Sequence, residues 1–368
     1  PDDISRMEMP KRITHFKIKK IKISKKINTK KIKELFEKSK KPLVVIGNGC
    51  LADTTILDIK KFIKKNKIPY SSTWAALHNF SSKDPFNLGS FGVAATRYGN
   101  FAIQKADLIL FLGVRLSGQL TGTNTSTFAP NAKKIVVDID KEEFTSQRLP
   151  KIDLKFNCDV NELIKILNRT KINSNVAKIK TWVAEIGRLK KNYPVLHKNN
   201  IINKNFVDPY FFFDKFYSSI DKNSIVIPDA SANLVWAYQS LKTEKNPDMF
   251  TAFNHSPMGY SIAASVGAYF GSPKKKIYAL IGDGSVPMNV QELETIKNYK
   301  VNVAIIILNN KGYGLIKQTQ ETWLKSVYAG TDKSSGLSLP NNVKIAASYG
   351  IKSYILKNND EIDKNIKK

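Results

Sequence analysis

The chain has 368 residues, of which 24% are charged and 42% hydrophobic, and its formal net charge is +28. This length exceeds the roughly 250–300 residues that one hydrophobic core supports, so we expect two domains. Seven of the 59 basic residues are arginines, and the lysines are scattered along the chain, which argues against a nucleic-acid-binding protein.

Residues 1–30 are polar and rich in lysine, which predicts a linker. From residue 31, apolar segments alternate with helical ones. Helices are predicted at 31–40, 54–66 and 99–105, and strands at 42–46, 68–71, 108–112 and 135–139. This alternation is typical of a parallel sheet with helices on both faces. The first predicted domain covers residues 31–165 and is Rossmann-like.

A polar helical stretch, residues 166–204, predicts a connector to a second domain at 205–368. Helices are predicted there at 209–219 and 260–270, and strands at 225–228, 277–281 and 303–308. The predicted fold class is therefore α/β, with two doubly wound parallel-sheet domains. The chain opens on Pro1 and stops at Lys368 within an αβ repeat, so we expect both ends to be cut and the second domain to be truncated.

Two polar motifs follow the last two predicted strands. Gly282-Asp283-Gly284-Ser285 comes after one strand and Asn309-Asn310 after the next. An aspartate and an amide at the carboxyl ends of two strands can converge on Mg²⁺, which prefers oxygen ligands and shares them with phosphates. The glycines allow a diphosphate to approach the backbone, and the following helix is expected to point its N-terminus at it. Two buried strands with turn glycines are the alternative.

These motifs, their interval and their flanks resemble the thiamin-diphosphate-binding motif. The run from Gly282 to Gln320 is similar to the acetolactate synthase branch of thiamin-diphosphate-dependent enzymes. The resemblance implies Mg²⁺ bound by the side chains of Asp283 and Asn310 and by the backbone carbonyl of Gly312.

The same resemblance implies the residues that hold thiamin diphosphate. Met258 would meet the aminopyrimidine ring through its backbone, and Met288 would lie under the bent cofactor. The full implied set is Ser231, Ala232, Asn233, Met258, Gly282, Asp283, Gly284, Ser285, Met288, Asn310, Gly312 and Tyr313.

The first domain resembles the family's central domain, which holds FAD in true acetolactate synthases. Gly47, Arg115 and Asp140 fall at positions that could serve a dinucleotide. The segment 116–122 lacks the acid and the arginine usual there, so FAD and a purely structural sheet both remain open. A dinucleotide-dependent oxidoreductase is disfavoured, because no GxGxxG follows the first strand.

The resemblance implies a thiamin diphosphate- and Mg²⁺-dependent enzyme acting on a 2-oxo acid, with pyruvate the expected donor, by decarboxylation and then carboligation. Thr319 stands where the synthases usually have tryptophan. Alternatives are therefore a related enzyme that ligates a two-carbon unit to a keto-sugar in surface-sugar biosynthesis, or a simple 2-oxo acid decarboxylase. A non-catalytic scaffold is disfavoured by the retained pair of Asp283 and Asn310.

The catalytic residue itself stays unknown. The family's ylid-forming glutamate belongs to an N-terminal pyrimidine-binding domain that nothing in this chain matches, so the chain alone is expected to be inactive. His255, next to the pyrimidine contact, is a candidate acid or base, with packing as the alternative. The family also implies a homodimer or homotetramer. With Cys50 and Cys158 outside any disulfide pattern and no apolar run of about 20 residues, we expect a cytoplasmic protein without a membrane partner.

Overall fold

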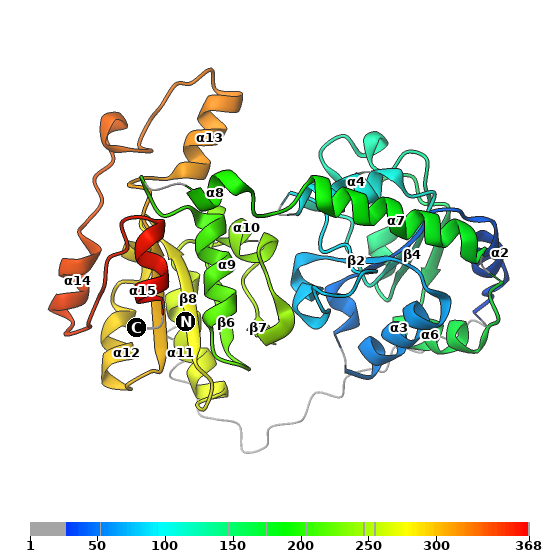
Figure 1. The fold of residues 1–368 in the computed structure, drawn as a ribbon, viewed down its shortest axis with the longest axis horizontal. Helices are drawn as coiled ribbons and strands as arrows, with labels where there is room; N and C mark the ends of the chain where they lie inside the picture. Colours follow the sequence, from blue (N-terminus) through cyan, green and yellow to red (C-terminus); the bar gives the residue numbers. More distant parts are fainter. Residues whose placement is uncertain are drawn as a thin grey trace, which may run out of the picture.

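The computed structural model shows two α/β units side by side, each built on a parallel sheet (Figure 1). It describes residues 27–51, 53–93, 95–145, 148–173, 175–202, 205–245, 247–253 and 255–366. Almost all of the predicted linker, 1–30, lies outside these residues.

The first unit contains a five-stranded sheet in the order β2-β1-β3-β4-β5, with every pair parallel. Its strands are β1 (Pro42–Ile46), β2 (Tyr70–Ser72), β3 (Leu108–Leu112), β4 (Lys133–Asp138) and β5 (Leu154–Asn157). Its helices are α2 (Lys30–Lys38), α3 (Asp53–Asn66), α4 (Arg97–Lys105), α5 (Gly118–Thr121), α6 (Val160–Arg169) and α7 (Val176–Asn192). β1 and β3 are buried along their whole length, as expected for central strands of a covered parallel sheet.

Alternate residues of these strands enter two separate cores. Val44 and Ile46 pack with α2, α3 and α6 on one face, whereas Leu43 and Val45 pack with α4 and α7 on the other. The period of two along a strand therefore divides one apolar run between two helical layers. β5 escaped the sequence prediction because it is a short edge strand with alternating, half-exposed residues.

Helix packing on the first sheet continues past the predicted boundary at residue 165. That boundary falls inside α6, whose Leu163 and Leu167 lie in the core of the first unit. α7, predicted as part of a connector, also belongs there, since Trp182 is buried and its indole nitrogen donates to the carbonyl of Pro42 at 3.2 Å. Glu185 of the same helix pairs with Lys41 at 2.8 Å. α7 therefore packs on the first sheet.

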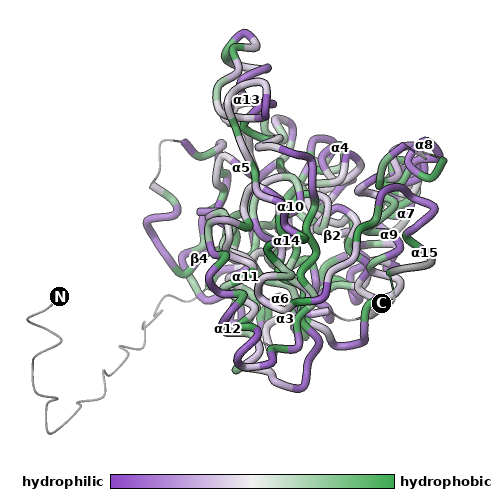
Figure 2. The backbone as a smooth tube through the Cα atoms, turned by 90° about the vertical axis from the view of Figure 1, so that its left-hand side faces the viewer, coloured by the Kyte–Doolittle hydropathy of each residue, from purple (hydrophilic) through white to green (hydrophobic). Residues whose placement is uncertain are grey.

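The second unit has a four-stranded parallel sheet in the order β7-β6-β8-β9. Its strands are β6 (Ile225–Pro228), β7 (Asp248–Met249), β8 (Ile277–Gly282) and β9 (Val303–Leu308). Its helices are α8 (Lys198–Ile202), α9 (Pro209–Ser219), α10 (Ala232–Gln239), α11 (Tyr260–Gly271), α12 (Glu292–Asn298), α13 (Gly314–Trp323), α14 (Asn342–Ser348) and α15 (Ile362–Asn365). α13 projects away from the sheet (Figure 2).

The two units touch through the short helical turn Trp74–Asn79 of the first. Leu77 enters the core of the second unit, and the ring of Trp74 lies 5.5 Å from that of Phe253. The side chain of Gln239 donates to the carbonyl of Ala95 at 2.7 Å. Among the described helices, none combines the length and apolar composition that a membrane span requires.

Candidate metal centre and diphosphate site

The predicted site residues lie at the carboxyl edge of the second sheet. In the order β7-β6-β8-β9, the chain changes direction across the sheet between β6 and β8. Asp229 follows β6, and Gly282-Asp283 ends β8. Open α/β sheets bind ligands at such a switch point, because the two connections diverge there and leave a crevice.

The two predicted motifs meet at this edge. Gly282 is in register with Leu308, and the amide of Asp283 donates to the Leu308 carbonyl at 3.2 Å. The carboxylate of Asp283 accepts from the amide of Gly284 at 3.0 Å, and the nearby backbone of Lys311 and Gly312 acts to lower its pKa. We call residues 310–313 the cation loop. The structure thus places the cation loop against Asp283.

Polar groups of Asn310, Gly312 and Asp283 lie close together here. One polar atom of the Asn310 amide lies 2.7 Å from the carbonyl oxygen of Gly312 and 3.1 Å from Oδ1 of Asp283. Adjacent ligands of an octahedral Mg²⁺, each about 2.0–2.1 Å from the ion, lie roughly 2.9 Å apart. That atom is the amide oxygen when the three surround a cation, and the nitrogen when it donates to both acceptors. The two distances are therefore compatible with adjacent ligands of Mg²⁺, as they are with two hydrogen bonds from the amide nitrogen.

Asp283 carries the charge of this site. Its side chain is buried, and this burial raises the pKa of the carboxyl above its ordinary value, although the backbone donors oppose the shift. A bound cation would favour the ionised form. Among the described residues, no group of three or more His, Cys, Asp or Glu side chains could hold a metal ion. One carboxylate would neutralise half of the charge of a divalent cation.

The loop after β6 has an unusual backbone. Ser231 has φ +67° and ψ −145°, a region that residues other than glycine seldom adopt. The Asn233 amide is engaged inside the loop, donating to the carbonyl of Ala230 at 2.6 Å and accepting from the amide of Asp229 at 3.1 Å. The Asn233 side chain therefore braces the turn, and the backbone amides of this loop stay candidates for contact with a diphosphate.

Asp229 is a residue that the sequence reasoning left outside the site. It is fully buried and accepts from the amides of Gly259 at 3.1 Å and Ser261 at 3.0 Å. The hydroxyl of Ser285 also bonds to it, and burial raises its pKa. Asp229 therefore ties the loop after β6 to the start of α11 and to the motif after β8. A lone aspartate after a strand gives no local signal of this role.

A broad cavity lies beside the motif Gly282–Ser285 and the cation loop. Ser256 and Met258 line the cavity, whereas the Met288 side chain is 50% exposed. The motif is followed by a 3-10 turn, Val286–Asn289, and α12 begins only at Glu292. The expected helix N-terminus directly after the motif is thus absent, because residues 286–289 take the tighter turn.

Tyr313, the last residue of the cation loop, also lines the cavity. Its ring packs on Gly284, with a ring carbon 2.3 Å from the position that a Cβ would take there. Thr319 on α13 lines the same cavity, and its hydroxyl donates to the Leu315 carbonyl at 3.0 Å. His255 is exposed and does not line the cavity. The described residues that line it include neither glutamate nor histidine.

The first sheet has the equivalent switch point between β1 and β3, but backbone fills it. A Cβ on Gly47 would lie 2.0 Å from the carbonyl oxygen of Gly113. The amide of Gly49 donates to the same carbonyl at 3.2 Å. Arg115 pairs with Glu143 at 2.8 Å, and Asp140 accepts from the amide of Glu142. The residues at the positions that could serve a dinucleotide thus contact other groups of the protein in this structure.

Two family models of known proteins match the chain, one in each unit. The family model "Thiamine pyrophosphate enzyme, central domain" matches residues 29–167, and "Thiamine pyrophosphate enzyme, C-terminal TPP binding domain" matches residues 229–368. The chain is 30% identical over 332 residues to an acetolactate synthase large subunit of Cyanidium caldarium. The matched region covers 88% of this chain and 54% of that protein.

Two further relatives are also acetolactate synthases. Identity is 29% over 337 residues to an acetolactate synthase large subunit of Porphyra purpurea, covering 91% of this chain and 55% of that protein. It is 28% over 369 residues to acetolactate synthase 1, chloroplastic, of Nicotiana tabacum, covering 98% of this chain and 54% of that protein. The chain thus spans about half the length of these relatives.

Proposed function

The chain belongs to the thiamine pyrophosphate enzyme family, and from this premise we propose that it holds thiamin diphosphate through Mg²⁺ bound by Asp283, Asn310 and the carbonyl of Gly312. The observation that carries the proposal is the spacing of 2.7 and 3.1 Å around the Asn310 amide. When bound, the cofactor supplies the nucleophilic carbon and the electron sink for decarboxylation of a 2-oxo acid.

The protein's own groups bind and orient that cofactor. The backbone around Ser231 and Gly282 lies at the switch point, where its amides can approach a diphosphate. Met258 and Tyr313 line the cavity above, where they can exclude water. As the family resemblance implies, we assign the proton transfer to a glutamate outside this cavity, whose described lining residues include neither glutamate nor histidine.

The reaction that we propose is decarboxylation of a 2-oxo acid, with pyruvate as the expected donor, followed by carboligation. Similarity to acetolactate synthase large subunits supports it. Thr319 favours a second candidate, carboligation to a larger acceptor such as a keto-sugar. Because its hydroxyl is used by the Leu315 carbonyl, this residue offers space rather than a hydrogen bond. Turnover of pyruvate with a panel of small ketones and keto-sugars, measured with a glutamate-bearing pyrimidine-binding domain supplied, in wild type and Thr319→Trp, separates the two.

We also propose that the first sheet is structural and holds no FAD, because the groups at its switch point bond to one another. Lack of quenching of flavin fluorescence by the protein is the expected result. A homodimer or homotetramer fits the exposed apolar side chains of α13, Leu315, Ile316 and Trp323. The buried free thiols of Cys50 and Cys158 fit a cytoplasmic location.

Calorimetry tests the central proposal. Thiamin diphosphate is titrated into the chain with Mg²⁺, and again with a chelator in its place, using wild type and Asp283→Ala. We expect Mg²⁺-dependent binding to wild type only, and no binding of thiamin, which lacks the diphosphate. Equal binding to Asp283→Ala would refute the assignment of the cation site.

A further inference from the structure

The chain returns to the cation loop after α13. Residues 328–336, which we call the return turn, fold back so that the carbonyl of Thr331 accepts from the amide of Tyr313 at 2.9 Å. A Cβ on Gly312 would lie 2.4 Å from the same carbonyl oxygen. Thr331 is 1% exposed, although it lies between mostly exposed segments. The return turn therefore presses on the two residues that follow Asn310 and Lys311.

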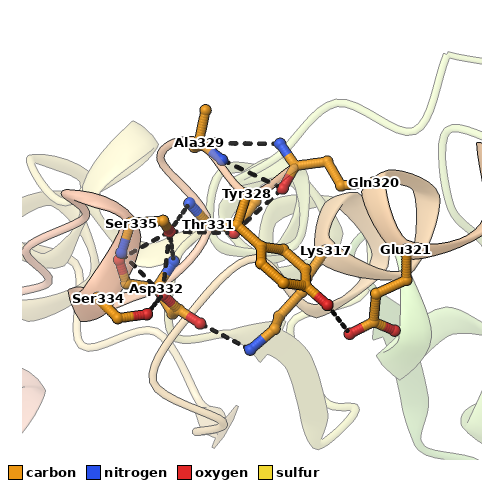
Figure 3. A network of polar contacts seen from close by, with 9 residues as sticks. All are labelled: Lys317, Gln320, Glu321, Tyr328, Ala329, Thr331, Asp332, Ser334 and Ser335. Carbon is orange, nitrogen blue, oxygen red and sulfur yellow. Dashed lines mark hydrogen bonds and ion pairs between the residues drawn. The ribbon is translucent and has the colours of Figure 1, made fainter. Parts of the chain in front are cut away.

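Side chains from α13 and the return turn hold Thr331 in place (Figure 3). Gln320 accepts from the Thr331 hydroxyl at 3.3 Å and donates to the carbonyl of Ala329 at 3.1 Å. The hydroxyl of Ser335 accepts from the amides of Thr331 and Asp332, both at 2.9 Å. The side chains of Gln320 and Ser335 thus bond to the main chain of Ala329, Thr331 and Asp332.

An ion pair joins the return turn to the helix. Nζ of Lys317 lies 2.7 Å from Oδ2 of Asp332, and Lys317 together with Ser334 and Ser335 holds the pKa of Asp332 well below its usual range (Figure 3). Tyr328 donates to Glu321 at 2.9 Å one turn further along α13. An exposed pair contributes little by itself. Here, however, the pair of Lys317 and Asp332 links α13, which follows the cation loop, to the residue next to Thr331. Thr331 in turn contacts the cation loop.

We propose that Lys317, Gln320 and Asp332 are positioning residues for the divalent cation, acting through Thr331 on the carbonyl of Gly312. This inference rests on the proposed function, because it takes Gly312 as a cation ligand. A ligand carbonyl must stay about 2.0–2.1 Å from Mg²⁺, and the Gly312 backbone has no side chain to anchor it. Thr331 supplies that anchor from outside.

Loss of these positioning contacts should lower the affinity of the site for Mg²⁺. Groups that orient metal ligands typically cost about 10–100-fold in affinity when they are removed. Lys317→Met should therefore raise the apparent Kd for Mg²⁺ about tenfold, and Gln320→Ala by at least as much. Lys317→Arg keeps the pair with Asp332 and should restore the wild-type value. Lys333→Met removes the same charge from an exposed position in the return turn and serves as the matched control.

The experiment is a calorimetric titration of Mg²⁺ into the 368-residue chain with thiamin diphosphate in excess, alongside thermal melts of each variant. The expected result is a raised Kd for Lys317→Met at an unchanged Tm, with rescue by Lys317→Arg and no effect of Lys333→Met. Gln320 is buried, so the surface variant Lys317→Met decides the matter if Gln320→Ala fails to fold.

Two failures are distinguishable. If wild type shows no Mg²⁺-dependent binding, both the proposed function and this inference are overturned. If wild type binds and Lys317→Met binds equally well, only the inference is overturned, and the return turn is a surface feature without effect on the cation. Loss of binding in Lys333→Met as well would also overturn it, because charge alone would then explain the effect.

Discussion

Replacement of Ser231 by glycine tests the backbone geometry of the diphosphate loop. Ser231 has φ +67° and ψ −145° just before α10, and its side chain makes no capping hydrogen bond. Such a conformation costs about 1–3 kcal/mol for a residue with a Cβ. Glycine adopts it without strain but loses about 0.4–1 kcal/mol through the greater freedom of its unfolded chain.

The difference predicts that Ser231→Gly stabilises the second domain by roughly 0.5–2 kcal/mol. For a domain of this size, each kcal/mol shifts Tm by about 2–4 °C. Little is lost with the hydroxyl, because it caps nothing. Ser231→Ala is the matched control: it removes the same hydroxyl and keeps the strain, so its stability should lie within about 0.5 kcal/mol of wild type.

Urea unfolding of wild type and both variants, followed by near-ultraviolet circular dichroism, measures these differences. The reasoning is refuted if Ser231→Gly is no more stable than Ser231→Ala. That result would mean that residue 231 has relaxed into an ordinary conformation and that the loop after β6 differs from the one described.

Three further predictions address other parts of the molecule. Gly47→Ala should destabilise the first domain by about 3 kcal/mol or more, since its Cβ would meet the Gly113 carbonyl, whereas Gly118→Ala, with open space around it, should be nearly neutral in chemical denaturation. Because burial raises the pKa of Asp283, protons compete with the cation, so calorimetric Mg²⁺ affinity should fall as pH falls through that raised pKa, by up to about tenfold per pH unit; a flat profile would contradict it. Burial also raises the pKa of Cys50 to about 12, so at pH 8 about one thiol in ten thousand is ionised, and a thiol reagent should label this residue only after unfolding, as mass spectrometry can show.

The sequence by itself determined the elements whose signal is local. Apolar runs ending in glycine marked β1 and β8, and a helix was predicted at 209–219, where the structure has α9 with the Asp208 carboxylate capping its first turn. It also determined the pairing of Asp283 with Asn310, because both follow strands of one parallel sheet and such ends meet at the same edge. No knowledge of side-chain contacts was needed for that step.

Only the tertiary structure decided what depends on partners distant in the chain. β5 and β7 are short edge strands with polar residues, so they carry almost no apolar signal, and α7 joined the first domain through Trp182. The roles of Asp229, bonded to residues about 30 positions ahead, and of Thr331, pressed on Gly312, arise from backbone groups that have no sequence pattern. Every residue other than proline carries a main-chain amide and a carbonyl, so the fold alone could show which amides the Asp229 carboxylate accepts from and which residues the Thr331 carbonyl contacts.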